Sequence, residues 1–271
     1  MACNEARHRK ATRILPVLLK TVGDPLPDVI KTHREGIFMF KQLLKRLIFG
    51  CKADSAAYIR HLRHKGMRIG EGTVIFDPRR SFLDETRPWM VEIGRNVQIT
   101  RGVTILTHGY DWSVLKEKYG CVLGSCGKVT IGNNVFIGMN AILLKGAAVG
   151  DNTIIGAGSV VIGIIPENCV AAGNPARVIC SLEAYLQKRR AAQEAEARHL
   201  VQEYRAVYGK DPGVKELSEF FWLFSDDPDV LPPQWQEKMA LQGNEAQSRQ
   251  ALRKNQKKYE NMEAFLQSFP R

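Results

Sequence analysis

His108 is the residue whose type and setting best suit acid–base chemistry in this 271-residue chain. It is the only histidine between residues 65 and 198, and it follows the run Ile105-Leu106-Thr107 directly. An imidazole titrates near neutral pH, so it can take a proton from a hydroxyl or an amine. Asp111 or a backbone carbonyl can hold the second ring nitrogen. The residue type fits equally well a histidine that is only exposed or hydrogen-bonded.

Two segments of the sequence carry side chains that suit a sugar. Asp84, Arg87 and Trp89 offer a carboxylate, a guanidinium and a flat ring for the apolar face of a sugar. Tyr110 and Asp111 follow the histidine closely in the sequence. We predict that these five residues bind the acceptor. An alternative stays open, in which Trp89 caps the end of the fold and Arg87 pairs locally.

The cysteines indicate neither a metal site nor a disulfide framework. They form no CxxC pair, and their positions are Cys3, Cys51, Cys121, Cys126, Cys169 and Cys180. This usage predicts a reducing, cytoplasmic setting. We expect no metal, because a zinc hydratase needs about three histidines around its ion. A cysteine nucleophile is not expected either, since the histidine described above is the only one near Cys121 and Cys126.

Aliphatic residues return at every sixth position in the middle of the chain. These positions are Ile131, Ile137, Leu143, Val149, Ile155 and Val161, and glycine follows four of them. Such a hexad is the signature of a parallel β-helix, in which three short strands close one triangular coil. The aliphatic side chains would stack inside the prism at the strand spacing of about 4.8 Å. Glycine and asparagine would supply the positive φ of the corners.

The same phase appears earlier and then breaks. It runs from Ile69 to Ile105 with a lapse over residues 77–90, and the step from Ile105 to Ile131 is not a multiple of six. A loop must therefore leave the prism within residues 107–128, with His108 at its mouth. Insertions in repeat folds map to loops, and loops commonly carry function.

These patterns divide the chain into three regions. We predict a basic arm with helices over 1–68, a β-helix over 69–180 and a helical extension over 181–271. In the last region Ser181 can cap a helix to about Tyr208, and Val214–Phe224 reads as a shorter apolar helix. The final forty residues show no clear pattern. The fold class is therefore mainly β, flanked by helices at both ends.

The net charge of +11 lies almost wholly in the N-terminal region. Residues 1–68 hold 15 Lys/Arg against 5 Asp/Glu, whereas residues 69–180 hold 10 against 9. A nearly neutral repeat argues against nucleic acid as a partner. The pattern of apolar and basic residues predicts an amphipathic helix with basic flanks over residues 36–50. That helix suits either docking on the base of the prism or peripheral contact with the inner membrane surface.

Four stretches resemble the left-handed β-helix acetyltransferases of the hexapeptide-repeat superfamily. They are residues 105–112, residues 128–138, residues 155–161 and the run Ala172-Gly173-Asn174-Pro175-Ala176-Arg177. The nearest likeness is to the sugar O-acetyltransferases of the maltose, galactoside and capsular-polysaccharide types. The resemblance covers about a third of the chain strongly.

The resemblance implies an activity and an assembly. It implies transfer of acetyl from acetyl-CoA to a sugar hydroxyl by direct attack, with His108 as general base. It also implies homotrimers with each active site between two prisms. N-acylation of an amino sugar or nucleotide sugar, and a non-catalytic trimeric scaffold, are the alternatives. The acceptor itself and the length of the acyl group stay undecided.

By matched position, the resemblance also implies where CoA binds. The expected residues are Gly138, Met139, Ala157, Gly158 and Arg177, although corner geometry alone also accounts for the glycines. Arg177 would meet a phosphate. The sequence departs from the family at Ile162-Gly163-Ile164, where Thr-Lys-Asp is usual. This removes a hydroxyl and a cation that commonly meet CoA.

Overall fold

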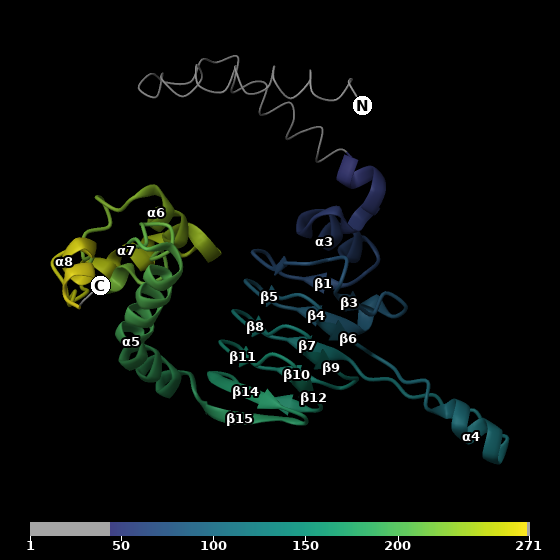
Figure 1. Cartoon of the computed structure of the whole chain (residues 1–271). Helices are drawn as coiled ribbons and strands as arrows, with labels where there is room; N and C mark the ends of the chain where they lie inside the picture. Colours follow the sequence, from purple (N-terminus) through teal and green to yellow (C-terminus); the bar gives the residue numbers. More distant parts are fainter. Residues whose placement is uncertain (1–43, 270–271) are drawn as a thin grey trace, which may run out of the picture. The chain divides into compact units, whose positions relative to one another are not determined.

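The computed structural model describes residues 44–269 (Figure 1). The predicted arm over residues 1–35 lies outside the described residues, as do residues 36–43 of the predicted amphipathic helix. The chain divides into two units between Ala53 and Asp54. In the first unit, residues 44–49 are helical and the 3₁₀ helix η1 (Gly50–Ala53) follows. No described helix is both long enough and apolar enough to cross a membrane.

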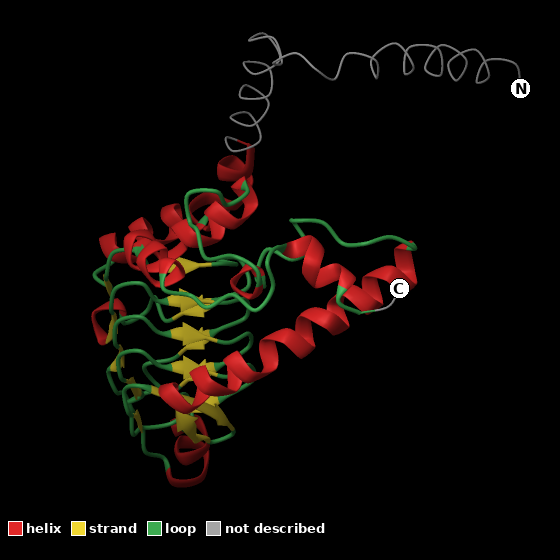
Figure 2. Ribbon diagram, turned by 90° about the vertical axis from the view of Figure 1, so that its left-hand side faces the viewer, coloured by secondary structure: helices red, strands yellow, loops and turns green. Residues whose placement is uncertain are grey.

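The second unit contains the predicted parallel β-helix, which is confirmed. Its strands stack in three sheets (Figure 2), and each of the first four coils contributes one strand to each sheet. The first sheet is β1 (Arg68–Ile69), β4 (Val91–Ile93), β7 (Val129–Ile131), β10 (Ala148–Val149) and β13 (Ile164–Ile165). The second is β2 (Val74–Ile75), β5 (Gln98–Ile99), β8 (Phe136–Ile137), β11 (Ile154–Ile155), β14 (Cys169–Gly173) and β15 (Ala176–Ser181). The third is β3 (Phe82–Leu83), β6 (Thr104–Ile105), β9 (Ile142–Leu143) and β12 (Val160–Val161). Pairing is parallel except between β14 and β15, which form an antiparallel hairpin.

The core of the prism consists of the aliphatic residues that recur at the sixth position. In the first sheet Ile93 pairs with Ile131, and Ile131 pairs with Val149. In the third sheet Ile105 pairs with Leu143. All of these side chains are buried. Burial of each contributes roughly 1.5–3 kcal/mol, so the stacked rows supply the main stabilisation of the coils.

The prism continues through the predicted lapse, where the prediction was wrong. Strand β3 lies inside residues 77–90, and its Leu83 is buried and pairs with Ile105. The step from Ile75 to Leu83 is eight residues instead of six. A turn supplies the two additional residues, and the backbone N–H of Ser81 donates to the carbonyl of Asp77 at 3.0 Å. The turn shifts the phase without ending the coil.

Corner asparagines have positive φ as predicted, but the glycines after the aliphatic residues have another role. Asn140 has φ 58° and Asn152 has φ 53°. A Cβ on Gly94 would instead lie 2.5 Å from the carbonyl oxygen of Gly132, and one on Gly138 would lie 2.4 Å from the backbone nitrogen of Ala157. These glycines are required because neighbouring coils approach closely, and not because of their φ.

A loop leaves the prism after β6 and returns at β7, as the break in phase predicted. It carries helix α4 (Trp112–Tyr119) away from the coils (Figure 1). Gly120 ends α4 with φ 74°. The helix was not predicted.

Helix α3 (Ser55–His64) confirms the helix predicted before the prism. Asp54 caps it by accepting from the backbone N–H of Ala57 at 2.8 Å. Its buried face carries Tyr58, Ile59 and Leu62, and it contacts β1 and β2. The 3₁₀ helix η2 (Pro88–Met90) lies between β3 and β4.

Helix α5 (Leu182–Tyr208) follows the hairpin and is capped by Ser181, as predicted. It contacts β14 and β15 at its start. Helices α6 (Pro233–Ala240), α7 (Glu245–Arg253) and α8 (Met262–Gln267) gather near its C-terminal end (Figure 1). The 3₁₀ helix η4 (Leu241–Gly243) joins α6 to α7.

One prediction for this C-terminal region was wrong. Residues 214–224 form turns and the 3₁₀ helix η3 (Phe221–Leu223) in place of one helix. Those of the final forty residues that the structure describes are folded and contribute to a buried core. In that core Phe221 stacks on Trp235 at 5.5 Å between ring centroids, and Leu252 and Phe265 are fully buried. Packing of aromatic rings holds short elements that have no regular hydrophobic period.

Candidate active site

His108 and Asp84 meet at the corner between the third and first sheets. Asp84 follows β3 in one coil, and His108 follows β6 in the next coil. The Nδ1 atom of His108 lies 2.8 Å from Oδ2 of Asp84. The Asp84 side chain is fully buried, whereas the imidazole is 21% exposed. Asp84 therefore holds the imidazole from the side away from solvent.

Every oxygen of the Asp84 carboxylate accepts hydrogen bonds. Oδ2 accepts from the backbone N–H of Thr107 at 3.1 Å and from its hydroxyl. Oδ1 accepts from Thr86, from the hydroxyl at 2.6 Å and from the backbone N–H at 3.0 Å. Burial raises the pKa of Asp84, but the hydrogen bonds from Thr107, Thr86 and His108 outweigh burial and hold the pKa well below its ordinary value. The carboxylate is therefore ionised at neutral pH.

This arrangement selects one tautomer of the neutral imidazole. An ionised carboxylate can only accept, so Nδ1 must carry the proton that faces Asp84. The lone pair of a neutral ring then lies on Nε2, the nitrogen that faces away from Asp84. That is the form a general base needs, and the carboxylate also stabilises the imidazolium that forms after proton transfer.

The structure corrects the roles expected for two carboxylates. Asp84 was predicted to bind the acceptor, but its burial and its filled hydrogen bonds make it the partner of His108 instead. Asp111, which was considered as that partner, is exposed and accepts from the Ser125 hydroxyl at 3.4 Å. Asp84 was missed as the histidine's partner because the two residues are 24 positions apart and meet only through the stacking of coils.

A chain of polar side chains connects the two ends of the loop to the coil that follows the coil of His108. Nζ of Lys145 donates to the Ser125 hydroxyl at 2.5 Å, and that hydroxyl donates to Asp111. The backbone N–H of Gly127 donates to the carbonyl of Thr107 at 2.9 Å. We call Lys145, Ser125 and Asp111 the loop clamp. It holds the two ends of the loop together beside the imidazole.

Aromatic rings extend from the histidine into the loop. The centroids of His108 and Tyr110 are 6.3 Å apart, and those of Tyr110 and Trp112 are 5.4 Å apart. The Tyr110 side chain is 72% exposed. Trp89 is also exposed, at the corner that carries Asp84. Arg87 is partly buried beside η2. These side chains offer flat and polar surfaces at and near the corner of the candidate base.

The residues expected to bind CoA lie at another corner, between the second and third sheets. Gly138 is buried directly after β8, and Met139 is exposed beside it. Ala157 and Gly158 occupy the same corner one coil later, where the backbone N–H of Gly158 donates to the carbonyl of Met139 at 2.8 Å. Arg177 is exposed on β15. The corner thus presents a row of small residues with a cation near its end.

Comparisons with known proteins place the chain in a family. A family model described as bacterial transferase hexapeptide (six repeats) matches residues 128–163. The protein CapG of Staphylococcus aureus is 39% identical over 127 residues, which cover 47% of this chain and 73% of CapG. The chain belongs to the hexapeptide-repeat acyltransferases. Its fold is accordingly the left-handed parallel β-helix, as predicted.

This acyltransferase matches its relatives of named activity over only part of their length. The galactoside O-acetyltransferase of Escherichia coli (strain K12) is 44% identical over 91 residues, which cover 34% of this chain and 44% of that enzyme. The solved maltose O-acetyltransferase from Clostridium difficile 630 is 29% identical, with 53% of this chain and 84% of that chain covered and a TM-score of 0.35. The chain thus spans less than half of the galactoside enzyme.

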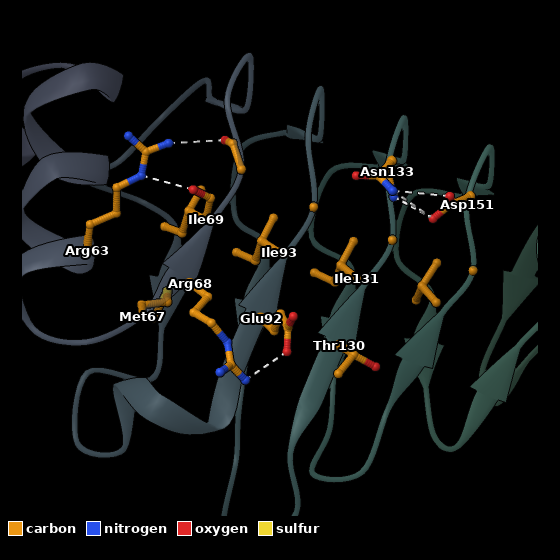
Figure 3. A pocket seen from close by; sticks show the side chains of 15 residues that line it. Arg63, Met67, Arg68, Ile69, Glu92, Ile93, Thr130, Ile131, Asn133 and Asp151 are labelled. Carbon is orange, nitrogen blue, oxygen red and sulfur yellow. Dashed lines mark hydrogen bonds and ion pairs between the residues drawn. The ribbon is translucent and has the colours of Figure 1, made fainter.

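A shallow hollow of this acyltransferase lies away from His108. It measures about 740 Å³ and lies over the first sheet (Figure 3). Its walls carry ion pairs and polar contacts, including Arg68 to Glu92 at 2.8 Å and Asn133 to Asp151. None of the predicted site residues lines it. In the described part of the chain, no group of three or more His, Cys, Asp or Glu side chains is placed to hold a metal ion.

Proposed function

We propose that the protein transfers an acetyl group from acetyl-CoA to a hydroxyl of a sugar or polysaccharide, with His108 as the general base. The observation that carries the proposal is the buried, ionised Asp84 at 2.8 Å from Nδ1 of His108, which leaves Nε2 to accept a proton. Family membership and the named O-acetyltransferase relatives support acetyl as the group transferred.

The reaction needs one proton acceptor and no covalent enzyme intermediate. Nε2 of His108 takes the hydroxyl proton while the oxygen attacks the thioester carbonyl carbon. The carbonyl oxygen becomes negative in the tetrahedral intermediate, where a backbone N–H near the loop would donate to it. Collapse breaks the C–S bond, and the CoA thiolate takes the proton from the imidazolium. Asp84 stabilises that imidazolium throughout.

Acetyl-CoA acts here as a substrate. We propose that it lies along the corner of Gly138, Met139, Ala157 and Gly158, because the small glycine and alanine residues and the backbone groups beside them leave room for the pantetheine arm. Arg177 would meet a phosphate. On the acceptor side, Tyr110 and Trp89 would contact the sugar face, and Arg87 and Asp111 its hydroxyls.

We also propose a homotrimer with active sites between prisms. The loop exposes apolar side chains that a monomer leaves in water: Val114, Tyr119, Val122 and Leu123 are each 59–69% exposed. Exposed apolar surface of this kind marks interfaces. Burial against a neighbouring prism would place that neighbour beside His108. A cytoplasmic location stays a proposal that rests on the absence of paired cysteines among the described residues.

Release of free thiol from acetyl-CoA across a panel of acceptors tests the function. The panel holds neutral sugars, amino sugars, nucleotide sugars and L-serine, so the preferred class of acceptor can be identified. His108→Ala should lower turnover by about 10²–10⁴-fold while circular dichroism stays unchanged. His199→Ala is the matched control, because His199 is 72% exposed on α5. Equal turnover of wild type and His108→Ala would contradict the proposal. Absence of thiol release with every acceptor would also contradict it and would favour a non-catalytic scaffold.

A further inference from the structure

Three arginines gather around one carboxylate at the corner between the second and third sheets. Arg79 and Arg80 lie in the turn that adds two residues to the first coil, and Arg101 occupies the same corner in the next coil. Their guanidinium nitrogens lie 3.9, 3.9 and 3.8 Å from the oxygens of Asp77. We call Arg79, Arg80 and Arg101 the arginine corner.

The arginine corner retains a net positive charge. Asp77 supplies one negative charge against the two positive charges of Arg80 and Arg101, so this part of the corner stays positive. In the part of the chain that the structure describes, Arg80 and Arg101 have no ion-pair partner other than Asp77. Their side chains are 60% and 48% exposed, whereas Asp77 is 20% exposed. The carboxylate therefore lies behind the guanidinium groups and holds them without neutralising them.

Backbone hydrogen bonds join this corner to the one proposed for acetyl-CoA. The N–H of Asn140 donates to the carbonyl of Arg101 at 3.0 Å, and the N–H of Gly158 donates to that of Met139 at 2.8 Å. Arg101, Met139 and Ala157 thus mark successive coils of one corner. The arginines lie on its N-terminal side, and the proposed donor residues lie on its C-terminal side.

The proposed binding sites for acetyl-CoA and for the acceptor sugar lie at different positions along the prism axis. Arg101 precedes β6 and His108 follows it, so both belong to the same coil. In an assembly of parallel prisms, residues of one coil lie at one height. Arg177 lies at the far end of the prism on β15, where the CoA phosphates would lie. The coil that contains His108 and the coil before it are then available to bind the acceptor.

We propose that the arginine corner binds an anionic group of the acceptor, which would make the acceptor an acidic sugar or an acidic polysaccharide. The inference rests on the proposed function and on its trimer, in which the corner proposed for acetyl-CoA in one subunit would meet His108 of its neighbour. A guanidinium fork matches both a carboxylate and a phosphate in two parallel hydrogen bonds. The shared chemistry is therefore an oxyanion, from either a uronic acid or a sugar phosphate.

Paired acceptors that differ only in charge test the inference. Galactose and galacturonic acid form the carboxylate pair, and mannose and mannose 6-phosphate form the phosphate pair. For wild type, kcat/KM should favour the anionic member of at least one pair. The double variant Arg80→Gln/Arg101→Gln should lower kcat/KM for that member about tenfold or more and leave its neutral partner within twofold. Arg95→Gln, at another corner of the same coil, is the matched control.

A binding readout keeps this inference separate from the proposed function. Fluorescence anisotropy of labelled oligogalacturonate and labelled maltooligosaccharide is measured with the His108→Ala variant, which binds without turnover. Loss of oligogalacturonate binding in the double variant supports the arginine corner even if no acetyl transfer is found. Equal losses for charged and neutral acceptors, or a raised KM for acetyl-CoA alone, would overturn it. So would equal binding of both oligosaccharides by the parent protein together with equal kcat/KM for the two members of the phosphate pair.

Discussion

The Nδ1 atom of His108 lies 2.8 Å from Oδ2 of Asp84, across two stacked coils of the prism. The backbone N–H and the hydroxyl of Thr107 donate to the same oxygen. Because the carboxylate is buried and each of its oxygens is occupied, it has no freedom to leave the imidazole. The geometry joins a residue of the first coil to the candidate base in the second.

Replacing Asp84 with asparagine should impair catalysis more than acetyl-CoA binding. The Asn amide can donate to Nδ1, which moves the ring proton to Nε2 and removes the lone pair that accepts from the hydroxyl. We expect kcat to fall by about 10²–10⁴-fold. The KM for acetyl-CoA should change little, because the proposed donor corner is distant from this side chain. Steady-state thiol release measures both quantities, and a fall in kcat of less than twofold would refute the assigned role.

The same substitution should also reveal a pH-dependent stability. The pKa of Asp84 is lower in the folded state than in the unfolded chain, so the ionised side chain stabilises the fold above about pH 4 and loses this effect as the pH falls further. Asp84→Asn should therefore cost about 1–3 kcal/mol at pH 7 and less at pH 3. Urea unfolding at several pH values measures the difference. A difference between wild type and Asp84→Asn that stays constant across these pH values would contradict the sign.

Release of the loop clamp should loosen the loop and weaken acceptor binding. Lys145→Ala removes the donor to Ser125, and Ser125→Ala removes the link to Asp111. Each variant should raise the KM for the acceptor several-fold with a smaller effect on kcat. The double variant should be no worse than either single one, because both break one chain. Hydrogen exchange of residues 111–125 should rise in parallel, and additive effects would exclude a shared role.

Close approach between coils should make one glycine indispensable and another replaceable. A Cβ on Gly94 would lie 2.5 Å from the carbonyl oxygen of Gly132, whereas one on Gly124 would have nothing within 4 Å. Gly94→Ala should therefore lower the free energy of unfolding by about 1–3 kcal/mol. Gly124→Ala should change it by less than about 0.5 kcal/mol. Similar unfolding midpoints for the two variants would show that the coils can separate without cost.

Local patterns predicted the prism because each hexad contains its own inward residue. The strands at Ile131 and Ile137 can each be predicted from their own hexad alone. Leu83 was not predicted because the turn at residues 77–81 adds two residues and hides the period. The helical cluster at the C-terminus was missed for a related reason. Its core residues, such as Leu252 and Phe265, come from short elements whose packing is not periodic in sequence.

The candidate base was predictable, and its partner was not. His108 was recognisable from its residue type, its place at the break in phase and its resemblance to known enzymes. Its pairing with Asp84 depends on which residues stack at a corner, and irregular turns on both sides set that register. From the sequence alone, Asp111 is an equally good candidate for the partner of His108. Only the stacking of coils decides between the two carboxylates.

A double-mutant cycle between His108 and Asp84 tests the central claim most directly. Turnover is compared for wild type, His108→Ala, Asp84→Asn and the double variant, with folding checked by circular dichroism. If Asp84 acts through the imidazole, the double variant will be as slow as His108→Ala alone. Losses that multiply would show that the two residues act independently and would contradict the account.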